Sequence, residues 1–150
     1  MKIDQKGIDL IIKWEGLRLK PYLCSAGVPT IGYGSTYYAN GTKVSLKDPE
    51  ITKECAVELF KSAIKNYEDA VTIMIGSKTI TQNQFNALVS FAYNLGNNAL
   101  RTSTLLKKVL ANPSDKTIEN EFNKWVNAGG KKLQGLVNRR KEEAQMYFSK

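Results

Sequence analysis

The change of pattern near residue 50 constrains the fold more than any other feature of this chain. The segment from Pro21 to Leu46 is rich in glycine, threonine, tyrosine and β-branched residues. Its Asn40-Gly41 pair is typical of a hairpin turn. From Thr52 onward, apolar residues recur at helical spacing instead. We therefore expect two or three short antiparallel strands followed by a helical region, which is an α+β arrangement that is mainly α.

Apolar periodicity and capping residues predict two helices around this β segment. A short helix is expected over residues 4–15, with Asp4 as its N-cap and Gly16 as its C-terminal stop. A long helix is expected from a Thr52 cap to about Ile75. The apolar stripe of the long helix comprises Ala56, Leu59, Phe60, Ala63, Ile64, Tyr67, Val71 and Met74.

The rest of the chain is expected to be helical, and the whole is expected to form one domain. Thr81 is expected to cap the next helix and Gly96 to end it. The single domain, 1–150, would contain a small β-hairpin lobe of about 16–50 and a helical lobe of about 51–150 together with the first helix. A cleft between the two lobes is the expected place for a polymer substrate. The later helices are expected over 103–111, 115–127 and about 136–148, with a loop over 127–135.

The charge of the chain favours an anionic partner. Its 150 residues carry 22 basic and 14 acidic side chains, a net charge of +8. Such a surplus suits nucleic acid, an acidic membrane face or an acidic polymer, and it also serves solubility alone. The densest basic cluster is Arg139, Arg140 and Lys141, which Glu142 and Glu143 follow at once. This mixture is typical of a solvated helix face, so we expect no nucleic-acid partner.

The chain has no histidine and two cysteines, Cys24 and Cys55. A four-ligand zinc site built from cysteine and histidine is therefore excluded, as are Ser-His-Asp and Cys-His catalytic systems. We expect no metal and no cofactor. Two cysteines do not make a disulfide scaffold. Cys55 is expected to be a buried structural cysteine, and a Cys24–Cys55 disulfide remains the alternative.

The N-terminal segment "MKIDQKGIDLIIKWEG" does not look like a targeting sequence. Charged residues at positions 2, 4, 6, 9 and 13 interrupt its apolar residues, so no signal peptide is expected. No apolar run in the chain approaches ~20 residues, so no stable membrane insertion is expected.

Three side chains between residues 15 and 30 are candidates for chemistry. Glu15 closes the first predicted helix, where the negative end of the helix dipole raises the pKa of a carboxyl. The neighbouring Trp14 and Leu17 would desolvate it further, and a protonated carboxyl suits a general acid. A surface glutamate at a helix end is the alternative. Cys24 and Thr30 taken singly are ordinary, as a small hydrophobe and as a strand residue.

Taken together, the three residues resemble the active-site pattern of the phage-type lysozymes of glycoside hydrolase family 24. That pattern is Glu, eight residues, Asp or Cys, five residues and Thr, and Glu15, Cys24 and Thr30 match it. The flanking segments "EGLRLKPYL" and "GVPTIGYGST" agree with the family. So do "QFNALVSFAYNLGNNALRTSTLL" (84–106) and "WVNAGGKKLQGLVNRRKEEAQMYF" (125–148), so the resemblance covers nearly the whole chain.

The resemblance implies a lysozyme-like fold and a muramidase that cleaves the β-1,4 bond between N-acetylmuramic acid and N-acetylglucosamine. Glu15 would be the general acid and Thr30 would hold the attacking water. Cys24 stands where many members have Asp, and Ser35 stands where many have His. As a partial thiolate, Cys24 would orient water or support positive charge; a covalent thiolate nucleophile is the alternative. Inversion at the anomeric carbon is expected from the family.

Further site residues are implied only by position. Arg139 or Arg140 would hold Glu15 in place, unless both belong to a solvated basic face. An aromatic ring offers a sugar apolar contact, whereas Tyr93 and Trp125 equally suit a core. The residues that match saccharide-contacting positions of related lysozymes are Tyr93, Asn94, Thr104 and Trp125.

The expected partner is bacterial peptidoglycan, bound by a monomer. The protein would accumulate in the host bacterial cytoplasm and reach the cell wall through a membrane lesion, causing lysis and phage release. Two other functions stay open from the residues alone. One is a weak or inactive domain that binds peptidoglycan without cleaving it. The other is a basic helical nucleic-acid-binding protein, although no convincing recognition helix with clustered basic residues is found.

Overall fold

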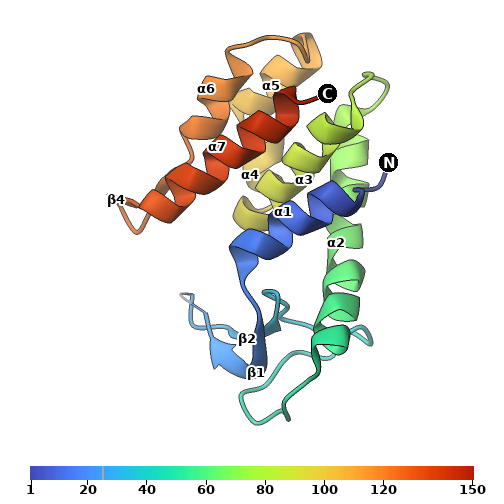
Figure 1. Cartoon of the computed structure of the whole chain (residues 1–150), viewed down its shortest axis with the longest axis vertical. Coiled ribbons are helices and arrows are strands. Elements are labelled where there is room, and N and C mark those ends of the chain that lie inside the picture. The colour runs from blue at the N-terminus through green and yellow to red at the C-terminus, as the bar shows by residue number, and fades with distance from the viewer. Residues whose placement is uncertain (25) are drawn as a thin grey trace. The chain divides into compact units, whose positions relative to one another are not determined.

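The structure, a computed structural model, describes residues 1–24 and 26–150. Helices dominate, and the described residues also form two small two-stranded antiparallel sheets, which confirms the predicted α+β, mainly α class (Figure 1). The chain forms two compact units, Ile12–Asn66 and Met1–Ile11 with Tyr67–Lys150. The elements in chain order are α1 (Gln5–Glu15), β1 (Arg18–Leu23), β2 (Pro29–Gly32), α2 (Lys53–Ile75), α3 (Gln82–Leu95), α4 (Asn97–Arg101), α5 (Thr104–Ala111), α6 (Ile118–Asn123), β3 (Asn127–Ala128), β4 (Lys131–Lys132) and α7 (Gln134–Phe148).

The sheet of the first unit pairs β1 with β2 in antiparallel register. Tyr22 lies opposite Thr30, and Arg18 lies opposite Gly32, with a bulge between the two pairs. The first strand therefore begins three residues before the predicted Pro21. The reason is local: Gly16 adopts a φ of 71°, which turns the chain out of α1 and into the sheet within two residues.

The predicted Asn40-Gly41 turn is confirmed. Gly41 has a φ of 86°, and its N–H donates to the Tyr38 carbonyl at 2.9 Å. Tyr37 and Lys43 form an antiparallel bridge on either side of this turn. A residue with positive φ at that position is what a tight hairpin connection needs, and glycine supplies it at little steric cost.

A small core holds the sheet against the first turns of α2. Ile31, Val44 and Leu59 are buried together. Gly32 also lies close to α2, because a Cβ on it would stand 3.3 Å from the Cβ of Ala56. Its φ of 69° requires glycine for a second reason. The sheet that carries Thr30 is thus fixed by its own apolar contacts.

In the second unit α7 packs along the central helix α3, and α6 packs on α7 (Figure 1). Three rings connect these helices. The rings of Phe91 and Phe122 are 5.9 Å apart, and those of Phe122 and Tyr147 are 5.8 Å apart. The Tyr147 hydroxyl donates to the Pro113 carbonyl at 2.7 Å, so its polar atom is satisfied. Burying each such ring stabilises the fold by roughly 1.5–3 kcal/mol.

The predicted helix caps are confirmed. The Asp4 carboxylate accepts from the Gly7 N–H at 3.2 Å at the start of α1. Thr52 Oγ1 accepts from the Cys55 N–H at 3.1 Å at the start of α2. Thr81 forms a capping box with Gln84 at the start of α3.

Between residues 96 and 127 the helices differ from the prediction. The short α4 was not expected, and α6 is shorter than the predicted 115–127. The cause is a side-chain turn at the start of that range. Asp115 Oδ1 accepts from the N–H and the hydroxyl of Thr117 at 2.9 and 2.7 Å. This local bonding competes with a helix and delays α6 to Ile118.

The segment predicted as a loop over 127–135 contains a small hairpin. β3 pairs with β4, Asn127 opposite Lys132 and Ala128 opposite Lys131. Gly129 and Gly130, with φ of 59° and 79°, form the connection. Two successive residues of positive φ are typical of a two-residue hairpin turn.

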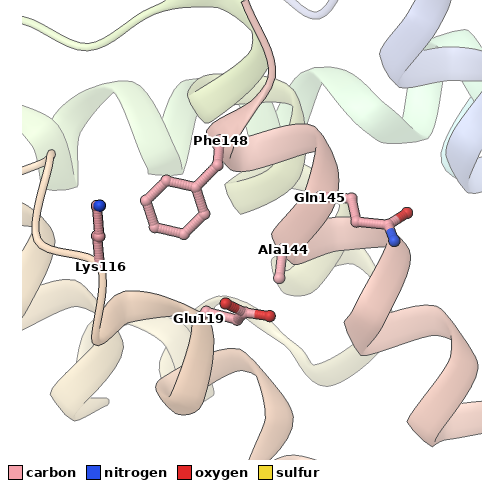
Figure 2. A pocket seen from close by; sticks show the side chains of 5 residues that line it. All are labelled: Lys116, Glu119, Ala144, Gln145 and Phe148. Carbon is pink, nitrogen blue, oxygen red and sulfur yellow. The ribbon is translucent and has the colours of Figure 1, made fainter.

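A cavity of about 540 Å³ lies beside the C-terminal end of α7. Lys116 and Glu119 line it from the α6 segment, and Ala144, Gln145 and Phe148 line it from α7 (Figure 2). None of these five is a predicted site residue.

In the part of the chain that the structure describes, no helix is long and apolar enough to span a bilayer.

Candidate active site

Glu15 is the last residue of α1 and is half-buried. The Gly16 N–H donates to the Ile12 carbonyl at 3.3 Å, which closes the helix immediately after the carboxyl. The prediction that Glu15 ends the first helix is therefore confirmed. Its side chain projects from the end of a helix that its N-cap and its terminal glycine define.

Cys24 follows β1 at the turn between the two strands. Its N–H donates to the Val28 carbonyl at 3.1 Å, and the Gly27 N–H donates to the Cys24 carbonyl at 2.8 Å. The thiol is free and half-buried.

Cys55 is also a free thiol, but it is exposed in the first turn of α2, so the expectation that it is buried is wrong. Its side chain falls on the solvent side of the helix, off the apolar stripe.

Thr30 lies in β2, directly opposite Tyr22. It is buried, with 3% of its surface exposed, so its hydroxyl has a fixed direction. Oγ1 donates its hydrogen to the Val28 carbonyl at 2.8 Å. The lone pairs of the hydroxyl therefore remain as acceptors.

The backbone of the turn stabilises the anionic form of the Cys24 thiol. The Val28 and Ala26 N–H groups hold the pKa of Cys24 below its ordinary value, an effect that burial opposes. Donors directed at a sulfur atom favour the thiolate over the thiol. The physical basis of the lowered pKa of Cys24 is a turn whose amides face the sulfur.

Tyr22 is a neighbour that the sequence reasoning missed. Burial raises the pKa of its phenol, Arg18 lowers it, and Glu15 and Cys24 raise it further. The Arg18 guanidinium lies 4.4 Å from the centre of the Tyr22 ring. The phenol therefore stands within electrostatic range of both the acid and the thiol. The sequence did offer a signal for Tyr22, because a strand residue such as Thr30 needs a partner on the neighbouring strand.

The three candidate side chains lie in one compact unit. They comprise one carboxyl at a helix end, one thiol with a lowered pKa and one fixed hydroxyl, all within Ile12–Asn66. Among the described residues, no group of three or more Cys, Asp or Glu side chains is placed to hold a metal ion.

The second unit brings together three other predicted site residues. Arg140 Nη2 donates to Asn94 Oδ1. The Arg140 guanidinium also lies over the ring of Phe91, 5.3 Å from its centre, and Phe91 packs edge-on against Trp125 with centroids 5.4 Å apart. Phe91 was not predicted as a site residue, although its helical spacing from Asn94 on α3 would have placed it on the same face.

Arg139 and Arg140 do not form a solvated face. They are 3% and 0% exposed, because both pair with the buried Glu143. The i,i+4 and i,i+3 spacings of this trio were visible in the sequence. The solvated-face interpretation is therefore wrong for these two arginines, and the presence of adjacent acids meant pairing rather than exposure.

Tyr93 and Thr104 are the other two residues predicted to contact saccharide. Tyr93 is half-buried, and its ring packs against Tyr67 with centroids 5.1 Å apart. Thr104 is exposed at the start of α5, next to Ser103, which caps that helix by accepting from the Leu106 N–H at 3.0 Å. Both positions leave a surface for a ligand.

Comparison with known proteins gives the family. A family model described as phage lysozyme matches residues 12–143. The chain belongs to the phage lysozyme family. The match includes Glu15, Cys24 and Thr30, together with α2 to α6 and most of α7. The family model and the resemblance noted in the sequence therefore cover nearly the same part of the chain.

Individual relatives of this phage lysozyme chain are endolysins. One from Bacillus phage B103 is 40% identical over 149 residues, which is 99% of this chain and 55% of that protein. The chain therefore spans about half the length of the B103 endolysin. One from Acyrthosiphon pisum secondary endosymbiont phage 1 is 40% identical, and the alignment covers 99% of both chains. A solved endolysin from Escherichia coli O157:H7 phage FAHEc1 has a TM-score of 0.87 at 37% identity, covering 99% of this chain and 94% of that one.

Proposed function

We propose that this chain is a muramidase that hydrolyses the β-1,4 bond between N-acetylmuramic acid and N-acetylglucosamine in bacterial peptidoglycan. One observation carries the proposal. Glu15, Cys24 and Thr30 keep the spacing of the phage-type lysozymes, and they project from a helix end and a hairpin of the same compact unit.

In the proposed reaction Glu15 protonates the glycosidic oxygen as the bond to the anomeric carbon breaks. The carboxyl then becomes a carboxylate beside the positive charge that develops on the sugar ring. Protonation of a leaving group by a positioned acid contributes typically ~10²–10⁴-fold to the rate. Loss of this single proton donor is therefore expected to abolish most of the activity.

The attacking water is held by Thr30 and Cys24. Thr30 Oγ1 donates to the Val28 carbonyl, so it can accept a hydrogen bond from water and direct the water oxygen toward the anomeric carbon. The Cys24 sulfur orients the same water, and the proton that the water loses passes to solvent. The glycosidic C–O bond breaks, and a new C–O bond forms to the water oxygen. The acid returns to its starting state by exchange with solvent.

We propose that the configuration at the anomeric carbon inverts, because water rather than the thiolate attacks the sugar. The alternative, a covalent bond between the sulfur and the sugar, would give retention. The anomeric proton signals of a freshly cleaved oligosaccharide distinguish the two outcomes. Initial formation of the α-anomer from a β-linked substrate supports inversion, and initial formation of the β-anomer contradicts it.

Saccharide contacts are proposed for Tyr93, Asn94, Thr104 and Trp125. Tyr93 and Trp125 present ring surface to the apolar faces of sugars. Asn94 and Thr104 offer hydrogen-bonding groups to acetamido and hydroxyl groups. The net charge of +8 favours association with the anionic cell envelope.

The proposed biological setting is host cell lysis. We propose that a monomer accumulates in the host bacterial cytoplasm, and that it acts on the wall after a membrane lesion admits it. Cleavage of the glycan strands then releases the phage.

Turbidity clearing tests the catalytic assignment. Chloroform-treated Gram-negative cells receive the wild-type chain, Glu15→Gln or the matched control Glu54→Gln, which makes the same change at another residue of the first unit. We expect clearing by the wild type and the control, and loss of at least ~10²-fold in rate for Glu15→Gln. Equal clearing by all three rejects Glu15 as the acid. No clearing by the wild type, with the protein retained on pelleted walls, supports the domain that binds without cleaving.

A further inference from the structure

The most densely charged interior site of the second unit is centred on Glu143. This carboxylate is completely buried, as are the Arg140 guanidinium and the Ser90 side chain. Its two oxygens have different partners. Oε1 lies 3.1 Å from Arg140 Nε, whereas Oε2 accepts from Arg139 Nε at 3.3 Å and from the Ser90 hydroxyl.

Two guanidinium groups therefore share one carboxylate in the interior. Burial raises the pKa of the Glu143 carboxyl, an effect that the charges of Arg140 and Arg139 oppose. Protonating Glu143 would leave two buried positive charges without this counter-ion, which is strongly unfavourable. Arg139 is anchored a second time, because its Nη2 donates to the Ser90 carbonyl at 3.3 Å.

The position of Arg140 determines the orientation of Asn94. A guanidinium only donates hydrogen bonds, so the Asn94 atom that meets Arg140 Nη2 must be the carbonyl oxygen Oδ1. The amide nitrogen then points the other way. Among the described residues, no hydrogen bond from Asn94 Nδ2 is found. Asn94 is half-buried, so this N–H₂ group is a pair of donors of fixed direction at the protein surface.

We infer that Glu143 is a positioning residue for Asn94. By holding the Arg140 guanidinium, it keeps the Asn94 amide turned so that Nδ2 donates to the carbonyl oxygen of a substrate acetamido group. The inference deepens the proposed function and rests on it, because it assigns Asn94 a donor role toward N-acetylated sugars. The contacts that carry it lie within one unit and join two elements, α3 and α7.

Steady-state kinetics on soluble peptidoglycan fragments, in a double-mutant cycle, test the inference. Glu143→Gln is compared with Glu119→Gln, the same change at an exposed residue of α6. Loss of one oriented hydrogen bond is expected to raise KM about fivefold, with kcat changed less than about twofold. In an Asn94→Ala background, Glu143→Gln should raise KM no further. If Glu143 had a merely structural role, Glu143→Gln would raise KM by the same factor with and without Asn94→Ala. That result overturns the inference.

Glu143→Asp covers the case in which the glutamine variant does not fold. It retains the charge but withdraws the carboxylate by one methylene from Arg140. We expect a folded protein whose KM lies between those of the wild type and the Asn94→Ala variant. A KM equal to that of the Glu119→Gln control would overturn the positioning role.

The side-chain amide signal of Asn94 gives a readout that does not need catalysis. The signal is assigned by its loss in Asn94→Ala, and the probe is tri-N-acetylchitotriose. We expect the chemical-shift change that the probe causes in this signal to be at least threefold larger in the wild type than in Glu143→Gln. Equal shifts in both, or none in the wild type, contradict the inference. Absence of peptidoglycan cleavage by the wild type contradicts the proposed function instead, and this titration then still tests the orientation of Asn94.

Discussion

Replacing Gly7 by alanine should destabilise the protein, although glycine in a helix is ordinarily unfavourable. Gly7 lies in the first turns of α1, where it faces α3. A Cβ built on it would stand 2.8 Å from both Cγ and Oδ1 of Asn86, closer than real Cβ atoms approach other atoms. The Asn86 side chain is buried and cannot turn aside freely.

The cost follows from the hydrogen bonds of Asn86. Oδ1 accepts from the Asp4 N–H at 3.3 Å and from Gln82 Nε2 at 2.9 Å, and Nδ2 donates to Asp4 Oδ1 at 2.7 Å. Three bonds at about 1 kcal/mol each bring the loss to about 3 kcal/mol if all of them break. Overpacking of this kind alone costs typically about 1–3 kcal/mol. The gain in helix propensity is about 1 kcal/mol. The crowding therefore wins, and we expect a net loss of about 2 kcal/mol.

Thermal unfolding followed by circular dichroism measures this loss. For a chain of this size, about 2 kcal/mol corresponds to a Tm lower by about 4–8 °C. Gly135→Ala is the matched control, because Gly135 is helical and nothing lies within 4 Å of its added Cβ. The control should raise Tm by about 2–4 °C, since only the propensity gain applies.

The reasoning is refuted if Gly7→Ala raises Tm as the control does. That outcome would mean that Asn86 moves away without losing its partners. A second check is the combination with Asn86→Ala, whose effect should be smaller than the sum of the single effects because both act at one contact.

Two further predictions concern the first unit. In a Cys55→Ser background, alkylation of Cys24 by iodoacetamide should show a pH midpoint below that of an unstructured cysteine peptide measured alongside, because backbone donors lower the pKa of Cys24. A midpoint equal to that of the peptide, or above it, contradicts the lowered pKa. Ser35→Ala should raise the free energy of unfolding by up to about 1 kcal/mol in urea titrations, because the buried Ser35 hydroxyl has no partner among the described residues; a loss of stability would show that the hydroxyl is bonded after all.

Short-range patterns in the sequence were enough to predict the helix caps and the Asn40-Gly41 turn. Asp4, Gly16 and Thr52 act on backbone groups within four residues of themselves, so their roles can be recognised locally. The Asn40-Gly41 turn is equally local. Glu15, Cys24 and Thr30 were recognised differently, because their spacing resembles the active-site pattern of the phage-type lysozymes.

The errors arose where a local pattern has two structural meanings. Residues 115–127 are compatible with a helix, but the Asp115 carboxylate binds the Thr117 backbone and hydroxyl instead. The glycine pair at 129 and 130 suits a loop and a hairpin equally, and pairing of Asn127 with Lys132 decides between them. In both cases the competing structures differ by only a few hydrogen bonds, which residue preferences do not resolve.

The sequence by itself determined the first helix, the Asn40-Gly41 turn and the start of the long helix, since their caps and turn depend on contacts within a few residues. Only the tertiary structure decided which polar groups are buried together. Glu143 meets Ser90 across 53 positions of the chain, and Arg140 meets Asn94 across 46. Helical periodicity places the arginines on a face, but it does not state what that face packs against. A long-range contact that supplies a counter-ion turns an apparently solvated charge cluster into an interior one.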